Sequence, residues 1–417
     1  MKVAYVVAGR MPTEKANGYQ SSQMCQAFLE NGADLRLLHP ARKQQYVEGI
    51  TPETTLEGYY SLRMPIPRTK LPIMDWIHFS EKIFGRGRRI VGGMASVATD
   101  VNTAYSLARR LRADRYDRVY VRSAFVLMAV AAMLPRRFLG TLYYEAHSLP
   151  RSVRVRSRLL ALFNRIGGVV ALTGALANEL KQQGVDPACI LVEHDGVDFQ
   201  SFDLDISKEA ARAELALPAP VTIAAYVGKF HTMGEEKGIP EILLSAGHLV
   251  EAFPALRFYF IGGPMDRVPV YEEIIRKAEL PRDRFVFVDR VDQRKVALFL
   301  KAADLLLMPF PWTTHYAYYM SPLKLFEYMA ADRPIVATRL PSVEEVLRHG
   351  VNALLAVPGD NVSLAASIRE LLEFPERGRA LATRALMDVQ EYSWKKRAGR
   401  ILRFMEVRQC TAGKRVA

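Results

Sequence analysis

The fold of the second half of the chain is decided by one stretch, Met320-Ser321-Pro322-Leu323-Lys324-Leu325-Phe326-Glu327-Tyr328-Met329-Ala330-Ala331-Asp332-Arg333-Pro334-Ile335-Val336-Ala337. Its first half predicts a helix, because Ser321 suits the N-cap and Pro322 suits the first helical position. An apolar face recurs every three residues at Leu323, Phe326 and Met329. Asp332-Arg333-Pro334 ends the helix, and Ile335-Val336-Ala337 predicts a short buried strand.

Lys324 is the unusual residue of this helix, because a cation in the first turn meets the positive end of the helix dipole. An anion at the helix N-terminus removes that cost, since free backbone N–H groups there already favour phosphate. Glu327, one turn later, can accept hydrogen bonds from hydroxyl groups. The order suits a sugar nucleotide, with its diphosphate first and its ribose next. A surface ion pair between Lys324 and Glu327 explains the two charges equally well.

The stretch resembles the C-terminal signature of retaining glycosyltransferases of family 4, in the variant that ends S-P-x-K-x-x-E-Y-M-A. The resemblance implies an α/β chain of the GT-B fold, with two Rossmann-like domains facing a central cleft. It also implies that the loop amides at Ser321, Pro322 and Leu323 hold the donor diphosphate and that Glu327 binds the ribose. The family signature has two glutamates separated by seven residues, and Tyr319 stands at the earlier position. This departure puts the usual donor-sugar contact in question.

The length and composition of the chain limit the number of domains and the classes of protein to be considered. A chain of 417 residues, half of them apolar, is long enough for two or three domains. No uninterrupted apolar run reaches the ~18 residues of a membrane span, and the N-terminus lacks the pattern of a signal peptide. The three cysteines, Cys25, Cys189 and Cys410, are scattered and form neither a disulfide framework nor a metal site. These features predict a cytoplasmic protein, and we expect no metal.

The net charge of +13 is concentrated in the first half of the chain. Residues 1–200 hold 27 Lys and Arg against 17 Asp and Glu, a net of +10, whereas residues 201–417 hold 30 against 27, a net of +3. This asymmetry suggests an anionic partner for the first half, such as a membrane surface at which the protein is peripheral or a lipid-linked acceptor. No nucleic-acid-binding motif is present, so nucleic acid is not expected as a partner. A generally basic, solvated surface is the alternative.

The first half of the chain begins with a predicted strand, loop, helix and strand, which indicates a parallel sheet. The helix is predicted over residues 21–31. The loop before it does not match the dinucleotide fingerprint G-x-G-x-x-G. It resembles the family's first loop, in which a glycine pair lies near the donor phosphates, although only Gly18 of that pair remains. An ordinary connection is the alternative.

Two basic segments of the first half suggest contact with anionic groups. Residues 71–84 combine apolar and aromatic residues and precede a cluster at Arg86, Arg88 and Arg89, which suits an interfacial membrane element. A helix packed inside the domain, followed by a solvated loop, is the alternative. The next predicted helix is crowded with four arginines, whose side chains suit acceptor phosphates, lipid headgroups or simply water: Arg151, Arg154, Arg156 and Arg158.

His147 follows a predicted strand at residues 142–146, and so lies at the edge of the sheet where ligands bind in open α/β folds. The resemblance implies that this histidine contacts the transferred sugar. Glu145 is a second candidate polar group, and a packed carboxylate at the strand end is its alternative role.

Domain boundaries are predicted from the turn at Asp195-Gly196-Val197-Asp198, which resembles the turn that closes the family's first domain. Residues 1–200 are then an N-terminal acceptor domain, 201–220 a linker, 221–390 the nucleotide-sugar domain, and 391–417 a closing helix that returns to the first domain. The pair Asp203 and Asp205 matches the D-x-D pattern of another glycosyltransferase fold, but its place in the predicted linker argues against a metal site.

The second domain begins with a predicted strand at residues 222–228 and a loop that holds Gly228, Lys229 and Lys237. Two lysines in one loop, with glycines that allow close backbone approach, suit a diphosphate clamp. The resemblance implies the same role, because the family has basic residues at both positions. The lysines could instead neutralise Glu235 and Glu236. Further on, Arg290 and Val291 follow a strand after which family members meet the nucleobase.

The resemblance thus implies a metal-independent glycosyltransferase with no cofactor other than its substrate, a UDP- or GDP-sugar. The acceptor is expected to be a hydroxyl of a glycan or of a lipid-linked sugar in polysaccharide or glycolipid synthesis. Catalysis is assigned to His147, Lys229 and Lys237. Two other readings of the same fold stay open: epimerisation or phosphorolysis, which the S-P-x-K-x-x-E variant disfavours, and a non-catalytic, partner-dependent sugar-nucleotide-binding subunit.

Overall fold

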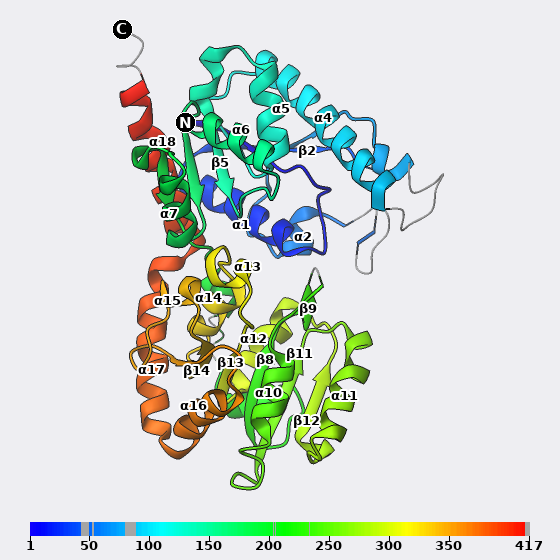
Figure 1. The fold of residues 1–417 in the computed structure, drawn as a ribbon, viewed down its shortest axis with the longest axis vertical. Helices are drawn as coiled ribbons and strands as arrows, with labels where there is room; N and C mark the ends of the chain where they lie inside the picture. Colours follow the sequence, from blue (N-terminus) through cyan, green and yellow to red (C-terminus); the bar gives the residue numbers. More distant parts are fainter. Residues whose placement is uncertain are drawn as a thin grey trace. The chain divides into compact units, whose positions relative to one another are not determined.

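The computed structural model describes residues 1–42, 50–51, 54–79, 89–202, 204, 206–232 and 234–412 (Figure 1). The chain forms two compact units. Unit 1 comprises Met1–His194 and Trp394–Ala417, and unit 2 comprises Asp195–Ser393. Each unit has a parallel sheet with helices connecting its strands, so both are α/β and Rossmann-like, as the sequence predicts.

Unit 1 is built on a seven-stranded sheet of order β3-β2-β1-β4-β5-β6-β7, in which every neighbouring pair is parallel. The central strands are apolar on both faces because helices cover both sides of a parallel sheet. The strands are β1 (Lys2–Val6), β2 (Asp34–Pro40), β3 (Arg68–Leu71), β4 (Arg118–Val121), β5 (Leu142–Ala146), β6 (Gly168–Ala171) and β7 (Ile190–Val192).

The helices of unit 1 are α1 (Ala16–Glu30), α2 (Leu56–Tyr60), α4 (Arg89–Ala113), α5 (Ala124–Met133), α6 (Val153–Phe163), α7 (Gly174–Gln182) and α18 (Trp394–Ala412). The predicted start of the first helix at residue 21 is wrong, because α1 begins at Ala16 and includes Gly18. The apolar positions used for the prediction begin later than the helix itself, since its first turn contains Asn17 and Gly18, which are weak helix formers.

The last helix of the chain, α18, packs against α1 of the first unit (Figure 1). Arg118 at the start of β4 donates from Nε and Nη2 to the carbonyl of Met405, at 3.1 and 2.9 Å. Asn31, which follows α1, donates to the carbonyl of Lys395 at 2.9 Å. A buried arginine and an exposed asparagine therefore help to hold this C-terminal segment on unit 1.

Unit 2 is built on a six-stranded parallel sheet of order β12-β11-β8-β13-β14-β15, with a separate two-stranded antiparallel pair. Side chains of β8 alternate between the two faces, so that Ala225 and Val227 enter one core and Ala224 and Tyr226 the other. The strands are β8 (Thr222–Val227), β9 (His231–Thr232), β10 (Glu235–Glu236), β11 (Leu256–Ile261), β12 (Phe285–Val288), β13 (Leu305–Met308), β14 (Ile335–Thr338) and β15 (Leu354–Ala356).

The helices of unit 2 cover both faces of its sheet: α8 (Phe199–Phe202), α9 (Lys208–Glu214), α10 (Ile239–Ala246), α11 (Val268–Lys277), α12 (Gln293–Ala302), α13 (Thr314–Tyr318), α14 (Leu323–Ala330), α15 (Pro341–Glu344), α16 (Asn361–Glu373) and α17 (Pro375–Asp388). Helix α14 is the one predicted from the signature stretch, and β14 is the strand that follows it. Phe326 and Met329 are buried in the core, whereas Leu323 is only partly buried.

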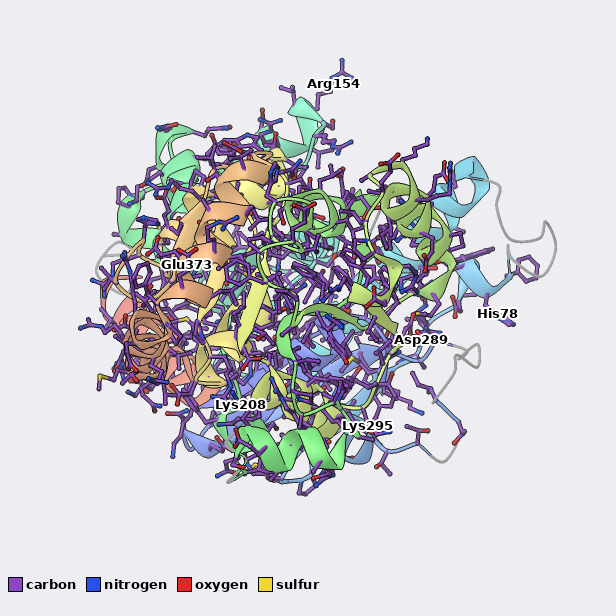
Figure 2. All side chains as sticks on the ribbon, turned by 90° about the horizontal axis from the view of Figure 1, so that it is seen from below. His78, Arg154, Lys208, Asp289, Lys295 and Glu373 are labelled. Atoms are coloured by element: carbon purple, nitrogen blue, oxygen red, sulfur yellow. The ribbon has the colours of Figure 1, made fainter. Side chains whose placement is uncertain are left out.

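The interpretation of residues 201–220 as a linker is wrong, because α9 packs against α12 within unit 2. Lys208, labelled in Figure 2, and Arg212 both bind the carboxylate of Asp304, at 2.9 and 2.6 Å. Arg212 is buried and also donates to the carbonyl of Ala302 at 2.9 Å. The segment looked like a linker because it is polar and rich in alanine, but its charges are used for packing.

Across the described parts of the chain, no helix combines the length and the apolar character needed to cross a membrane.

Candidate functional site

The sheet of unit 2 reverses its direction of winding between β8 and β13, and ligands of open α/β sheets bind at the carboxyl ends of the two strands beside such a reversal. Gly228 and Lys229 follow β8, and Phe310 follows β13 after one further residue. The predicted loop lysines and the signature helix α14 both belong to this edge of the sheet. Their side chains define the candidate donor site.

Three glycines allow the backbone to approach closely at this edge. Gly228, Gly238 and Gly262 have φ values of 141°, 95° and 130°, which side-chain-bearing residues rarely adopt. A Cβ atom at Gly238 would lie 1.9 Å from the carbonyl oxygen of Pro309, and one at Gly228 would lie 2.7 Å from Lys324 Nζ. Gly228 therefore leaves the space that the Lys324 ammonium occupies, and Gly238 lets the lysine loop contact the end of β13.

Lys324 points into an aromatic environment. Its Nζ lies 3.7 Å from the ring centroid of Tyr226 and 5.3 Å from that of Phe310. Part of the residue remains exposed, but Nζ itself is buried and forms no hydrogen bond with any described residue. Burial, and then repulsion from Lys237, lower the pKa of Lys324 well below its usual value, against a smaller opposing effect of Glu327.

Lys237 shares this environment. Its Nζ lies 4.4 Å from the ring centroid of Tyr316 and 5.4 Å from that of Phe310, the ring that Lys324 also contacts. Burial lowers the pKa of Lys237 to about 8, while the charge of Glu235 acts in the opposite direction. Lys237 and Lys324 thus both lie near the ring of Phe310. Two desolvated ammonium groups beside the same ring form a site that favours an anion.

Neutralisation of the loop lysines by both neighbouring glutamates does not describe the structure. The Glu236 carboxylate accepts a hydrogen bond from Tyr271 at 2.9 Å and is paired with Arg267. Glu235 is exposed and acts on Lys237 only as a nearby charge. Among the described residues, neither Lys237 nor Lys324 forms an ion pair, so their charge is available to another partner.

Glu327 lies one helical turn after Lys324, and no ion pair joins the two among the described residues. Burial raises the pKa of Glu327 to about 7, in spite of the opposing charge of Lys324. The surface ion pair considered from the sequence is therefore absent. A carboxyl group that titrates near neutral pH can either donate or accept a hydrogen bond with a hydroxyl group.

The predicted role of Ser321 as the N-cap of α14 is wrong. Pro322 occupies the N-cap position, and no side chain caps the helix. The Ser321 hydroxyl instead accepts a hydrogen bond from the Asp195 N–H at 2.8 Å and fixes the turn at the start of unit 2. Pro322 has no N–H to donate, so only Ser321 and Leu323 among the three predicted loop amides can bind a phosphate oxygen.

Other predicted donor residues also belong to unit 2. Lys229 is exposed, and its carbonyl accepts a hydrogen bond from Tyr226 at 2.7 Å. Arg290 is exposed after β12, and its N–H donates to Asp289 Oδ1 at 2.7 Å. Val291 packs against the core, and Tyr319 is the C-cap residue of α13.

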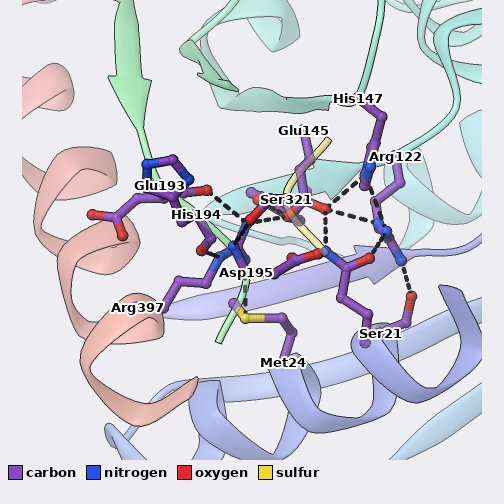
Figure 3. A network of polar contacts seen from close by, with 12 residues as sticks. Ser21, Met24, Arg122, Glu145, His147, Glu193, His194, Asp195, Ser321 and Arg397 are labelled. Atoms are coloured by element: carbon purple, nitrogen blue, oxygen red, sulfur yellow. Dashed lines mark hydrogen bonds and ion pairs between the residues drawn. The ribbon is translucent and has the colours of Figure 1, made fainter. Parts of the chain in front are cut away.

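His147 in unit 1 belongs to a polar network at the carboxyl end of β5 (Figure 3). Its Nε2 lies 2.9 Å from Glu145 Oε1 and 3.0 Å from Arg122 Nη2. Arg122, which follows β4, also donates from Nε to Glu145 Oε1 at 3.0 Å. The imidazole is thus oriented by two charged groups, and about a third of its side chain remains exposed, at 35%.

Glu145 is the centre of this network and is fully buried. Its Oε2 accepts hydrogen bonds from Tyr120 at 2.5 Å and from Arg397 of α18 at 3.0 Å. Burial raises the pKa of Glu145, but Arg397 and then Arg122 outweigh it and hold the pKa well below its usual value. The carboxylate therefore stays ionised, in a packed strand-end position that also holds His147.

Arg122 and Arg397 were missed by the sequence reasoning. Arg122 carries a usable signal, because it directly follows a buried strand at the ligand-binding edge of the sheet. Arg397 carries none, because it meets Glu145 across a separation of 252 residues. Gly18 has a structural role, since a Cβ atom there would lie 2.1 Å from the Tyr60 hydroxyl.

Known proteins match this chain in sequence and in fold. Residues 222–373 match the family described as glycosyl transferases group 1. D-inositol 3-phosphate glycosyltransferase of Streptomyces bingchenggensis is 29% identical over 241 residues, which are 55% of this chain and 50% of that protein. The enzyme of the same name from Mycobacterium tuberculosis is 28% identical over 216 residues, 51% and 42% of the two chains. The chain thus spans about half the length of the curated relatives it matches.

Solved structures share the fold of the whole chain. The Anabaena protein Alr3699/HepE, in complex with UDP, has a TM-score of 0.69 at 18% identity and covers 98% of this chain and 100% of its own. Sucrose-phosphate synthase from Thermosynechococcus elongatus has a TM-score of 0.74 at 18% identity, with 99% of both chains covered. The chain therefore has the GT-B fold.

Proposed function

We propose that this chain, whose residues 222–373 match the glycosyl transferases group 1 family, transfers a sugar from a nucleoside-diphosphate donor to an acceptor hydroxyl. The observation that carries the proposal is the pair of desolvated lysines, Lys237 and Lys324, at the winding reversal of unit 2. Both lie within the residues that match the family. A diphosphate is the anion that this family's substrates would bring to them.

We propose that Lys237 and Lys324 promote the transfer reaction by electrostatic stabilisation of the leaving group. When the bond between sugar and diphosphate breaks, negative charge develops on the leaving group, and cations already in place stabilise it without reorganisation. Because the pKa values of both lysines are lowered, a bound diphosphate would favour their protonated forms. Lys229, exposed on the same loop, is proposed to contact the outer phosphate oxygens.

The other parts of the donor are assigned to the remaining residues of the site. We assign the ribose hydroxyls to Glu327, the nucleobase to the segment at Arg290 and Val291, and the start of α14 to the diphosphate. His147 of unit 1, held by Glu145 and Arg122, is the side chain we propose to hold the transferred sugar. We further propose a retaining outcome, in which the acceptor attacks from the face that the diphosphate leaves.

The donor and acceptor to test first come from the similar proteins. Alr3699/HepE is described in complex with UDP and with UDP-glucose, so UDP-sugars are the first donors. The sequence relatives are named for D-inositol 3-phosphate, which makes phosphorylated inositols the first acceptors. Glycan and lipid-linked acceptors of polysaccharide or glycolipid synthesis are the second group.

The donor site is tested by thermal unfolding of the full chain with UDP, GDP, ADP and CDP. A ligand at ~100 times its dissociation constant adds about 2.7 kcal/mol of stability. We expect one base to raise the melting temperature of the wild type and of a Lys295→Met control, which removes an exposed charge from α12. The Lys324→Met variant should lose that rise. No rise for any nucleotide in the folded wild type would refute the donor site.

A second candidate function is favoured by Tyr319, which stands where the family has its first glutamate. Loss of that carboxylate suits a subunit that binds the sugar nucleotide but needs a partner, or performs no transfer. Release of nucleoside diphosphate in the presence of the inositol phosphates and glycan acceptors separates the two candidates. Binding without release in every mixture would support the non-catalytic one.

A further inference from the structure

Helix α4 of unit 1 presents an apolar stripe that no described element covers. Four large side chains at helical spacing form it: Met94, Val97, Val101 and Tyr105. They are 47% to 71% exposed, whereas Ala104, Leu107 and Ala108 on the other side of the helix are buried. The stripe spans twelve residues, so that about 16 Å of helix separates its ends at a rise of ~1.5 Å per residue. Singly exposed apolar residues are ordinary, but a continuous row marks a contact surface.

The apolar surface continues onto the segment that follows β3. Met74, Trp76 and Phe79 are exposed there, and the last two rings meet edge to face with centroids 6.2 Å apart. The Met74 N–H donates to the Asn102 side chain at 3.2 Å, which places Met74 beside the turn that carries Val101. Figure 2 shows His78, next to Phe79, at the outer edge of the molecule. We call these seven residues, four from α4 and three from this segment, the α4 face.

The charges around the α4 face are basic. Residues 89–113 contain four arginines and one acidic residue, Asp100. Burial raises the pKa of Asp100, against an opposing effect of Arg42, and Asp75 of the neighbouring segment is paired with Arg42 at 3.6 Å. Arg68 and Lys70 on β3 and Arg109 on α4 are exposed. A second copy of the chain would bring the same basic rim against this one, which like-charge repulsion opposes.

We propose that the α4 face binds an anionic membrane surface, with its apolar side chains in the headgroup region and its basic rim on the lipid phosphates. Interfacial helices bind by this combination of apolar area and cationic charge, and aromatic rings such as Trp76 and Tyr105 suit the headgroup level. The arginine cluster at Arg86, Arg88 and Arg89, for which the sequence suggested membrane contact, is not part of this argument. Arg86 and Arg88 lie outside the described residues, as does the Arg89 side chain.

The proposal is independent of the transfer reaction and extends beyond it. It places the enzyme on a lipid surface whatever its donor, so the acceptor can be a molecule anchored there. Arg151, Arg154 and Arg158, on or beside α6, are exposed and add charge there, but Val153 is the large apolar residue exposed among them. Within the described part of unit 1, we assign membrane contact to the α4 face because it combines a continuous apolar row with a basic rim.

The test is co-sedimentation of the full chain with phosphatidylcholine vesicles that contain 0% or 30% phosphatidylglycerol. We expect binding to the anionic vesicles, at least tenfold stronger than to the neutral ones and weakened by 0.5 M salt. Val97→Gln with Val101→Gln should reduce that binding at least tenfold. The matched control is Val270→Gln with Val362→Gln, which changes two exposed helical valines of unit 2 in the same way and should leave binding unchanged.

Thermal unfolding of both double variants shows whether the fold is kept, since all four positions are exposed. Equal vesicle binding by the wild type and the α4 variant would overturn the proposal, as would no binding by a folded wild type. Light scattering of the protein alone provides the remaining outcome. A dimer that the α4 variant dissociates would assign the face to a second copy of the chain instead of a membrane.

Discussion

Binding of a nucleoside diphosphate should weaken as the pH rises from 7 to 9, because the loss of a proton from Lys237 removes half of the lysine pair. The pKa of Lys237 in the unliganded protein is lowered to about 8. Its protonated fraction therefore falls from about 0.9 at pH 7 to about 0.1 at pH 9. If only the charged form binds the diphosphate, the apparent dissociation constant rises about tenfold, or ~1.4 kcal/mol.

The sign follows from the direction of the shift. A pKa below the ordinary value means that the free protein loses this proton early, and a bound anion raises the pKa again. The protein must therefore take up protons when the diphosphate binds. At pH 8, protonation of Lys237 accounts for about 0.5 proton per bound diphosphate. Lys324, whose pKa is also lowered, adds to this uptake. The terminal phosphate, with a second pKa near 6, is ionised throughout this range.

Isothermal titration calorimetry measures both quantities. Repeating the titration at pH 8 in buffers of different ionisation enthalpy gives the number of protons taken up. Lys237→Arg is the matched variant, because its guanidinium stays charged at every pH used, so it should bind with a flatter pH dependence and smaller proton uptake. A constant affinity from pH 7 to 9, with no proton uptake by the wild type, would refute the assignment of the diphosphate to this lysine.

Three further predictions concern stability, measured by urea unfolding. Glu327→Gln should stabilise the unliganded protein by about 1–3 kcal/mol at pH 8: the folded pKa is raised to about 7, so wild-type stability falls as the pH rises from about 4.5 through 7. Glu145→Gln should destabilise unit 1 by about 3–5 kcal/mol at pH 7, because Arg397 and Arg122 lose their buried carboxylate. Gly238→Ala should cost at least ~2 kcal/mol, because its Cβ meets the backbone of Pro309 at positive φ.

Each of these predictions has a control. The gain from Glu327→Gln should vanish at pH 4, where both the folded and unfolded carboxyl groups are protonated, and a gain that persists there would contradict the titration argument. Glu376→Gln removes a surface carboxylate that is 83% exposed, and should change stability by less than ~0.5 kcal/mol. Gly234→Ala also adds a Cβ at positive φ, but into open space, so it should cost only ~1 kcal/mol. Equal losses for the two glycines would remove the steric argument.

The parts of the fold that were predictable from the sequence are those determined by local patterns. The buried strands, the helix of the signature stretch and the glycine turns were read from apolar periodicity and from Gly and Pro positions. Thr173 shows the same kind of local signal, because its hydroxyl caps α7 by accepting a hydrogen bond from the Leu176 N–H at 3.1 Å. The Rossmann-like class and the glycosyl transferases group 1 resemblance followed from these elements, and the comparisons confirm both.

The parts that were not predictable depend on contacts between distant residues. Ser321 has the local features of an N-cap, but a hydrogen bond from Asp195 takes its hydroxyl. Residues 208–214 look like a polar linker until Asp304, some 90 residues later, pairs with two of their cations. The environment of Lys324 is likewise non-local, because Tyr226 comes from β8 and Phe310 from the loop after β13. Sequence spacing predicted that this lysine was unusual, but not that it was desolvated on aromatic rings.

Replacement of Lys324 tests whether this lysine serves the fold or binds the ligand. If a lysine stabilises the fold, its removal lowers the free energy of unfolding. Burial lowers the pKa of Lys324, so protonation of this lysine opposes folding, and the opposition decreases as the pH rises from the lowered pKa of the folded state to 10.5, the value in the unfolded chain. Lys324→Met should therefore raise the stability of the unliganded protein in urea at pH 7 while abolishing the stabilisation by nucleoside diphosphate. A variant that is less stable without ligand, and is still stabilised by it, would show that the buried ammonium serves the fold and that the diphosphate binds elsewhere.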